Sequence, residues 1–134
     1  MRDLAIIGIG QIPVGEHWTS GLRTLAAEAI YLALEDAGIE QVDALYVGNA
    51  YGSSYSSQTQ LGALIADHAG LANIEAFTVD AAEASGGAAI RTAYLAVASG
   101  AIETALVLGV EKSTDTLASA RVEARSVSLD ADYE

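Results

Sequence analysis

The chain has 134 residues, 51% of them apolar, and a formal charge of −12 from 18 acidic and 6 basic residues. This composition predicts one folded domain with a modest core. The shortage of Lys and Arg argues against binding to nucleic acid or to an anionic membrane surface. Since the chain has no cysteine, disulfides and thiolate metal sites are excluded. The acidic start is too short for a signal peptide, and no apolar run is long enough to span a bilayer, so we expect a cytoplasmic protein.

The first part of the chain alternates between strand and helix patterns. The apolar run at residues 4–9 is typical of a strand buried on both faces. Ser20 is expected to cap a helix over about residues 21–37, and Gly38 is a good stop signal for it. A second strand is expected at residues 44–47, followed by a loop rich in Ser, Tyr and Gln.

The same alternation continues in the second part. We expect a helix over about residues 58–69, a strand at 76–79, a helix at 82–99 and a strand at 104–108. Beyond Glu111 the periodicity weakens and polar residues dominate. Four strand–helix alternations with short connections predict an α/β fold with a mostly parallel sheet and helices on both faces.

The helix expected at residues 82–99 is apolar around almost its whole circumference. Glu83 and Arg91 are its charged residues, and small or apolar residues fill most of the other positions. A helix of this kind is normally buried on every side. Because a four-stranded sheet covers one side, we expect another chain or further sequence to cover the rest.

Two patterns invite a ligand-binding interpretation that the sequence does not support. Gly8 and Gly10 follow a strand pattern, but Pro13 stands at the third glycine position of a dinucleotide-binding motif and no helix opens there. His17 and His68 are the two histidines, and further ligands at metal-binding spacing are absent around them. We therefore predict neither a dinucleotide nor a metal, and a structural role for both histidines.

Glu83 is the candidate functional residue. It lies where a predicted strand runs straight into a helix of small residues, a junction at which enzymes place nucleophiles beside free backbone N–H groups. The simpler interpretation is an acid in the first helical turn, stabilised by about 0.3–1 kcal/mol through the helix dipole. Burial would raise the pKa of Glu83 and the helix N-terminus would lower it. The residue pattern alone leaves both interpretations open.

Residues 80–89 read DAAEASGGAA, which resembles the nucleophile motif EAACASGGAA of thiolases, the acyl-CoA:acetyl-CoA acyltransferases. Residues 108–115 are similar to the thiolase segment that contains Gly-Val-Glu-Lys. Residues 8–15, 43–49 and 62–67 fit the same family. The resemblance covers essentially the whole chain, and it is closest to the archaeal and bacterial branch of acetyl-CoA acetyltransferases and sterol-carrier-like thiolases.

The resemblance implies a thiolase-like N-terminal α/β half that is incomplete. Residues 1–111 would form this domain, and residues 112–134 would begin the loop region. Glu83 would stand at the catalytic position of the acyl-accepting cysteine, and acyl-CoA would be the substrate, in lipid metabolism, without a bound cofactor. In the family, the second half supplies the catalytic histidine, a second cysteine and an Asn-Glu segment. That half would also cover the apolar helix.

Three functions are then open. The chain is the N-terminal portion of a thiolase-like acyltransferase that is inactive alone, which we favour, because a carboxylate would attack a thioester weakly and form an anhydride. Alternatively, it is a non-catalytic partner subunit of a complete thiolase. A third function is a carbon–carbon lyase or decarboxylase in which Glu83 acts as an acid or base.

The resemblance also predicts the partners. They are a second copy of the chain or a thiolase C-terminal half. In thiolases the strand equivalent to residues 76–79 pairs with its mate across the twofold axis, so proline at Thr78 should abolish dimers. The five arginines are scattered along the sequence, and the chain alone is expected to bind coenzyme A weakly or not at all.

Overall fold

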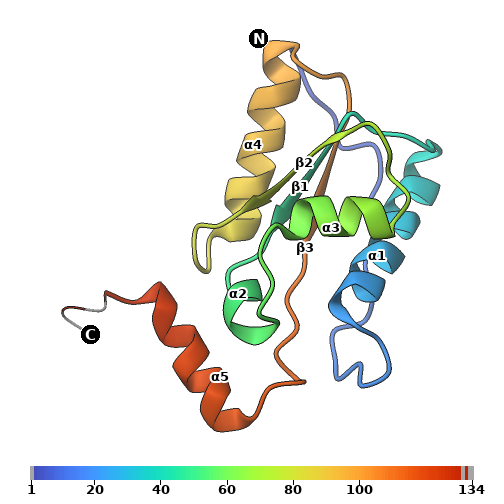
Figure 1. Ribbon diagram of the computed structural model, residues 1–134. Coiled ribbons are helices and arrows are strands. Elements are labelled where there is room, and N and C mark those ends of the chain that lie inside the picture. The colour runs from blue at the N-terminus through green and yellow to red at the C-terminus, as the bar shows by residue number, and fades with distance from the viewer. Residues whose placement is uncertain (1, 131, 133–134) are drawn as a thin grey trace.

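The computed structural model describes residues 2–130 and 132 as an α/β fold (Figure 1). Within this part of the chain, three strands alternate with helices. One further short helix follows the first strand, and a short α-helix and a 3₁₀ helix follow the last. The elements in chain order are α1 (Leu22–Ala37), β1 (Ala44–Gly48), α2 (Gly52–Tyr55), α3 (Leu61–His68), β2 (Glu75–Val79), α4 (Ser85–Ser99), β3 (Ala105–Gly109), α5 (Ala118–Arg125) and the 3₁₀ helix η1 (Ser126–Ser128).

The three strands form a parallel sheet in the order β2-β1-β3. Tyr46 in the central strand pairs with Phe77 on one side and with Val107 on the other. Asp43, just before β1, fixes the start of β3, because its carboxylate accepts hydrogen bonds from the backbone N–H groups of Glu103 and Thr104, both at 2.9 Å. These two bonds hold the pKa of Asp43 below its usual range.

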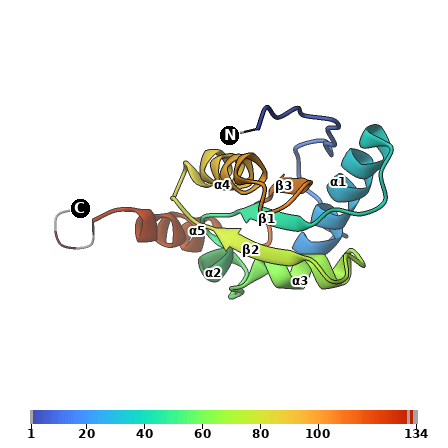
Figure 2. The same ribbon diagram turned by 90° about the horizontal axis from the view of Figure 1, so that it is seen from above.

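Helices cover both faces of the sheet (Figure 2). On one face, α1 and α3 pack on the side chains of Leu45 and Val47. On the other face, α4 packs through Ala89 and Ala93 on the side chain of Tyr46. The central strand is therefore buried along its whole length, whereas β2 is largely exposed. The predicted parallel sheet with helices on both faces is confirmed.

The predicted first strand is wrong. Residues 4–9 are not paired with the sheet, and Ile6 is 88% exposed. The segment instead runs along α1: Ile9 N–H donates to the Asp36 carboxylate at 2.8 Å, and a Cβ at Gly8 would lie 2.7 Å from the carbonyl oxygen of Ala33. An apolar run satisfies the pattern of a buried strand, but a strand also needs a neighbour that accepts its backbone hydrogen bonds.

The predictions locate the C-terminal ends of the helices better than their N-terminal starts. Gly38 ends α1 and Gly100 ends α4, both with the positive φ that glycine adopts without a steric penalty. The predicted cap at Ser20 is wrong, because Gly21 occupies the N-cap position and no side chain caps the helix. Within the described residues, no helix is both long enough and apolar enough to cross a membrane.

The outer face of α4 is exposed, as the apolar pattern of this helix predicts for an incomplete fold. Its buried positions are small residues such as Ala89 and Ala93, whereas Ile90, Tyr94 and Leu95 lie on the surface. The sheet accounts for one side of the helix only.

The free edge of β2 has a definite hydrogen-bonding pattern. Glu75 N–H donates to the Asp43 carbonyl and the Val79 carbonyl accepts from Asn49 N–H, so the odd-numbered residues of β2 face β1. Because backbone groups alternate in direction along a strand, Ala76 and Thr78 present their N–H and C=O groups to the outside.

Candidate functional site

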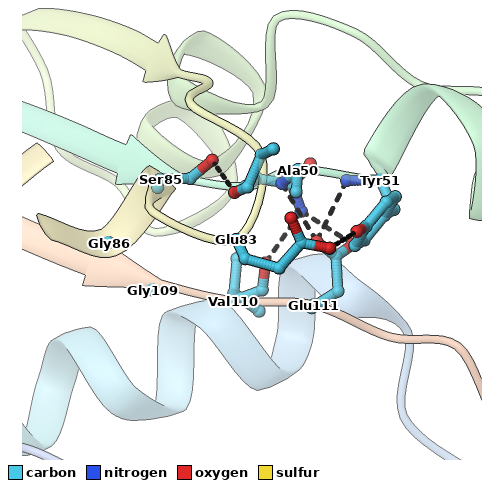
Figure 3. Close-up of a pocket in the computed structure, with 11 residues that line it drawn as sticks. Ala50, Tyr51, Glu83, Ser85, Gly86, Gly109, Val110 and Glu111 are labelled. Carbon is cyan, nitrogen blue, oxygen red and sulfur yellow. Dashed lines mark hydrogen bonds between the residues drawn. The ribbon is translucent and has the colours of Figure 1, made fainter. Parts of the chain in front are cut away.

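The candidate site lies at the carboxyl end of the sheet, where the segments that follow the three strands meet (Figure 3). It is an open cavity of about 370 Å³. Gly48 at the end of β1 allows the start of α4 to approach, since a Cβ there would lie 2.8 Å from the carbonyl oxygen of Ser85. Parallel α/β folds bind ligands at this end of the sheet. The cavity is lined by Gly48, Asn49, Ala50, Tyr51, Ala82, Glu83, Ser85, Gly86, Gly109, Val110 and Glu111.

A tight turn between β2 and α4 presents Glu83 to this cavity. Ala82 has a φ of +49°, a left-handed conformation that is costly for a residue with a Cβ. Ser85 holds the turn: its hydroxyl donates to the Ala82 carbonyl at 2.6 Å and accepts from Ala81 N–H at 2.9 Å. The helix begins at Ser85, so the prediction that Glu83 lies in its first turn is wrong. Glu83 precedes the helix by two residues.

The carboxylate of Glu83 points across the cavity to the segment that follows β1 (Figure 3). The Tyr51 hydroxyl donates a short hydrogen bond to Glu83 Oε1. The Ser128 hydroxyl lies 3.5 Å from the same oxygen and 3.3 Å from the Tyr51 hydroxyl. Glu83 is therefore linked to the segment after β1 through Tyr51 and to η1 through Ser128.

These donors determine the ionisation of Glu83. Its pKa is held below the usual range, chiefly by the Tyr51 hydrogen bond, then by its own backbone N–H, with smaller contributions from Ser128 and the positive charge of Arg125. Burial opposes the shift but is outweighed. Glu83 is consequently a charged carboxylate at neutral pH, which accepts hydrogen bonds and protons.

Glu111, two residues after β3, holds the segment that positions Tyr51. Its carboxylate accepts hydrogen bonds from the backbone N–H groups of Ala50 and Tyr51, both at 3.1 Å, and from Asn49 Nδ2 at 3.0 Å. Asn49 Nδ2 also donates to the Val110 carbonyl at 2.8 Å. The Tyr51 side chain is itself buried. The ends of β1 and β3 are thus joined by one carboxylate, and the direction of the Tyr51 hydroxyl follows from this arrangement.

Sequence reasoning singled out Glu83 but not the residues around it. Asn49 and Glu111 lie two and three residues after predicted strands. Since parallel strands end at one edge of the sheet, the sequence pattern could have placed these two residues together. Tyr51 lies in a segment whose residues have the pattern of a polar loop. Ser128 lies beyond the last segment in which apolar residues recur at regular spacing. That Glu83 stands at a nucleophile position stays a prediction.

The two histidines lie apart from the cavity. His17 Nε2 is 2.8 Å from the Pro13 carbonyl oxygen in the segment before α1, and His68 is exposed at the end of α3. Among the described residues, no group of three or more His, Cys, Asp or Glu side chains is arranged to hold a metal ion. Gly10 lies against the backbone of α1 instead of opening a phosphate-binding turn.

Comparison with known proteins identifies the family. Residues 4–133 match the family model described as the thiolase N-terminal domain. The acetyl-CoA acetyltransferase of Methanothermobacter thermautotrophicus is 46% identical over 119 residues, which are 87% of this chain and 31% of the relative. The acetyl-CoA acetyltransferase of Methanocaldococcus jannaschii is 49% identical over 119 residues, 87% of this chain and 30% of the relative.

A more distant relative is a β-ketoacyl-[acyl-carrier-protein] synthase III of Streptomyces avermitilis. It is 36% identical over 104 residues, 74% of this chain and 29% of the relative. The chain thus spans about a third of the length of the curated relatives it matches. The family match, the parallel α/β fold and the strand–turn–helix junction at Glu83 agree, and the chain belongs to the thiolase family as an N-terminal domain.

Proposed function

We propose that the chain is the N-terminal portion of a thiolase-like acyl-CoA acyltransferase and that it is inactive alone. The observation that carries the proposal is the position of Glu83 at the strained turn between β2 and α4, with its carboxylate in an open cavity at the carboxyl end of the sheet. A charged carboxylate is a poor acyl acceptor, since its attack on a thioester gives an anhydride.

The proposal includes an acyl-CoA substrate and a second polypeptide that completes the site. The exposed apolar residues Ile90, Tyr94 and Leu95 on α4 support the second polypeptide, because they form a surface that the sheet of this chain does not cover. The free edge of β2 offers the hydrogen-bonding groups of Ala76 and Thr78 to a second copy of the chain.

The experiment restores the nucleophile. The chain is co-expressed with the part of the M. jannaschii acetyl-CoA acetyltransferase that lies outside the match, and thiolysis of acetoacetyl-CoA is measured in the purified complex. We expect no activity for the unchanged chain and activity for Glu83→Cys. Glu35→Cys is the matched control, since it makes the same substitution at an exposed position on α1.

Two results would contradict the proposal. One is thiolysis by the unchanged chain without any second polypeptide. The other is a complex of Glu83→Cys that forms, has the circular dichroism of the unchanged complex and is still inactive. Glu35→Cys has to stay inactive, because a thiol away from the cavity has no route to the bound thioester.

The lowered pKa of Glu83 favours one alternative, in which the completed protein is a carbon–carbon lyase or decarboxylase. A carboxylate that is charged at neutral pH is suited to act as a general base, but not as a general acid. Glu83→Gln removes the charge and keeps the shape of the side chain. If the completed protein cleaves an acyl-CoA, Glu83→Gln should abolish that cleavage, and unchanged activity in this variant would exclude the alternative.

A further inference from the structure

A second cavity adjoins the cavity of Glu83. It has a volume of about 530 Å³ and lies between α2, α5 and the segment that follows β3. The two cavities have Tyr51 and Glu111 in common, so they lie side by side. The second cavity is lined by Tyr51, Tyr55, Glu111, Ser113, Ala118, Arg121, Val122 and Arg125.

This cavity gathers positive charge in a strongly acidic chain. Arg121 and Arg125 lie one helical turn apart on α5 and both line it, although the sequence suggests that the arginines are scattered. Of the other four basic residues, Arg2 pairs with Glu103 at 2.7 Å and Lys112 pairs with Asp115, while the remaining two lie on α1 and α4.

Within the described part of the chain, neither arginine forms an ion pair, although Arg125 acts electrostatically on Glu83 in the adjoining cavity. Glu111 is the acidic residue of the cavity wall, and its carboxylate already accepts three hydrogen bonds from the segment after β1. Two guanidinium groups that line one cavity without an ion pair favour an anionic ligand, which planar bidentate donors bind well.

We propose that Arg121 and Arg125 bind a carboxylate at the far end of the substrate's acyl group. The inference rests on the proposed function, because it takes the thioester to lie beside Glu83. The pantetheine arm of coenzyme A separates its phosphates from the thioester by many bonds, whereas these arginines line a cavity that adjoins the one containing Glu83. The anion that reaches them belongs to the acyl group.

The walls of the cavity fit the chain that connects these two ends. The rings of Tyr51 and Tyr55 lie 5.3 Å apart, centre to centre, and Ala118 and Val122 on α5 add apolar surface. Methylene groups of an acyl chain pack against such walls, and the arginines pair with a negative charge at the end of that chain. A short acyl chain that ends in a carboxylate therefore matches the cavity better than an uncharged acyl chain does.

The test uses thioesters of N-acetylcysteamine, which contain no phosphate. Binding of the glutaryl and pentanoyl thioesters to the ¹⁵N-labelled chain is followed by NMR titration, with pyrophosphate as a third ligand. We expect the glutaryl thioester to bind about tenfold more tightly than the pentanoyl thioester, and to shift the signals of residues 113–128. The double variant Arg121→Gln/Arg125→Gln should remove the difference, and Arg91→Gln on α4 should preserve it.

Each other outcome overturns the inference. Equal binding of the two thioesters would mean that the cavity does not recognise a carboxylate. Loss of the preference in Arg91→Gln would indicate a general effect of net charge, and pyrophosphate binding without a glutaryl preference would assign the arginines to phosphate. Because the titration measures binding without turnover, its result is independent of whether Glu83→Cys restores thiolysis in the completed protein.

Discussion

The contact between α3 and β2 provides a sharp test of the fold. A Cβ at Gly62, in the first turn of α3, would lie 2.5 Å from the carbonyl carbon of Phe77 and 2.8 Å from its backbone nitrogen and oxygen. These are backbone atoms of a strand, so they cannot rotate away as a flexible side chain would. The N–H of Gly62 also donates to the Thr78 hydroxyl at 3.0 Å. Gly62→Ala therefore has to separate the helix from the strand.

The magnitude follows from three contributions. Restoring an ordinary carbon–carbon contact moves α3 by about 1 Å, and overpacking of this kind costs about 1–3 kcal/mol. The weakened hydrogen bond to Thr78 adds about 0.5–1.5 kcal/mol. Alanine offsets about 0.5–1 kcal/mol, because it favours a helix over glycine. Gly62→Ala should thus lower the free energy of unfolding by about 2 kcal/mol.

Gly87 provides the matched control. It lies in the first turn of α4, and a Cβ there would meet no atom of the described residues within 4 Å. Gly87→Ala should therefore raise the free energy of unfolding by about 0.5–1 kcal/mol. Both variants are compared with the unchanged chain by urea denaturation followed by circular dichroism, with equal m-values as the condition for comparison. If Gly62→Ala is as stable as Gly87→Ala, α3 does not pack against β2 as described.

Three further predictions concern ionisation and assembly. Tyr51→Phe should raise the pKa of Glu83 toward its ordinary value, because the main donor to the carboxylate is lost; a ¹³C NMR titration that finds no change would refute this role of Tyr51. Asp43→Asn should be less stable than the unchanged chain at neutral pH. Since the pKa of Asp43 is lowered by folding, that difference should disappear as the pH falls through the folded-state pKa. Asp3→Asn, at an exposed position, is the control and should leave the urea midpoint at neutral pH unchanged. Thr78→Pro removes an outward N–H from the edge of β2 and should give a monomer by native mass spectrometry; a dimer of unchanged mass would place the interface elsewhere.

The elements that sequence reasoning predicts well are those whose pattern alone determines them. The central strand at residues 44–48 and the helices α1 and α4 have apolar residues at regular spacing and glycine stop signals, and their ends fall within three residues of the prediction. The segment at residues 4–9 has an equally apolar pattern, but within residues 2–130 and 132 it pairs with no strand. Strand formation depends on a neighbour, and periodicity within the segment carries no information about it.

Part of the candidate site could be predicted from the sequence. The junction at Glu83 follows from the strand and helix patterns, and the positions of Asn49 and Glu111 follow from the shared edge of parallel strands. The left-handed conformation of Ala82 does not follow from the sequence. Alanine gives no turn signal, and the residues around it favour a continuous helix. This one residue moves Glu83 out of the helix and directs it toward Tyr51.

The length of the glutamate side chain decides what Glu83 can do in the cavity. Its carboxylate extends two bonds farther from the backbone than the sulfur of a cysteine would, and it reaches the Tyr51 hydroxyl on the opposite wall. A substrate that approaches Glu83 has to compete with this hydrogen bond.

Glu83→Cys therefore makes two changes together, since it supplies a thiol and also frees Tyr51 and the space between the walls. Glu83→Gln keeps the length and removes the charge, so thioester binding in the two variants separates a missing nucleophile from an occupied cavity. If both bind the thioesters more tightly than the unchanged chain does, the charge of Glu83 is what weakens thioester binding. If only Glu83→Cys binds the thioesters more tightly, the length of the Glu83 side chain is what weakens thioester binding.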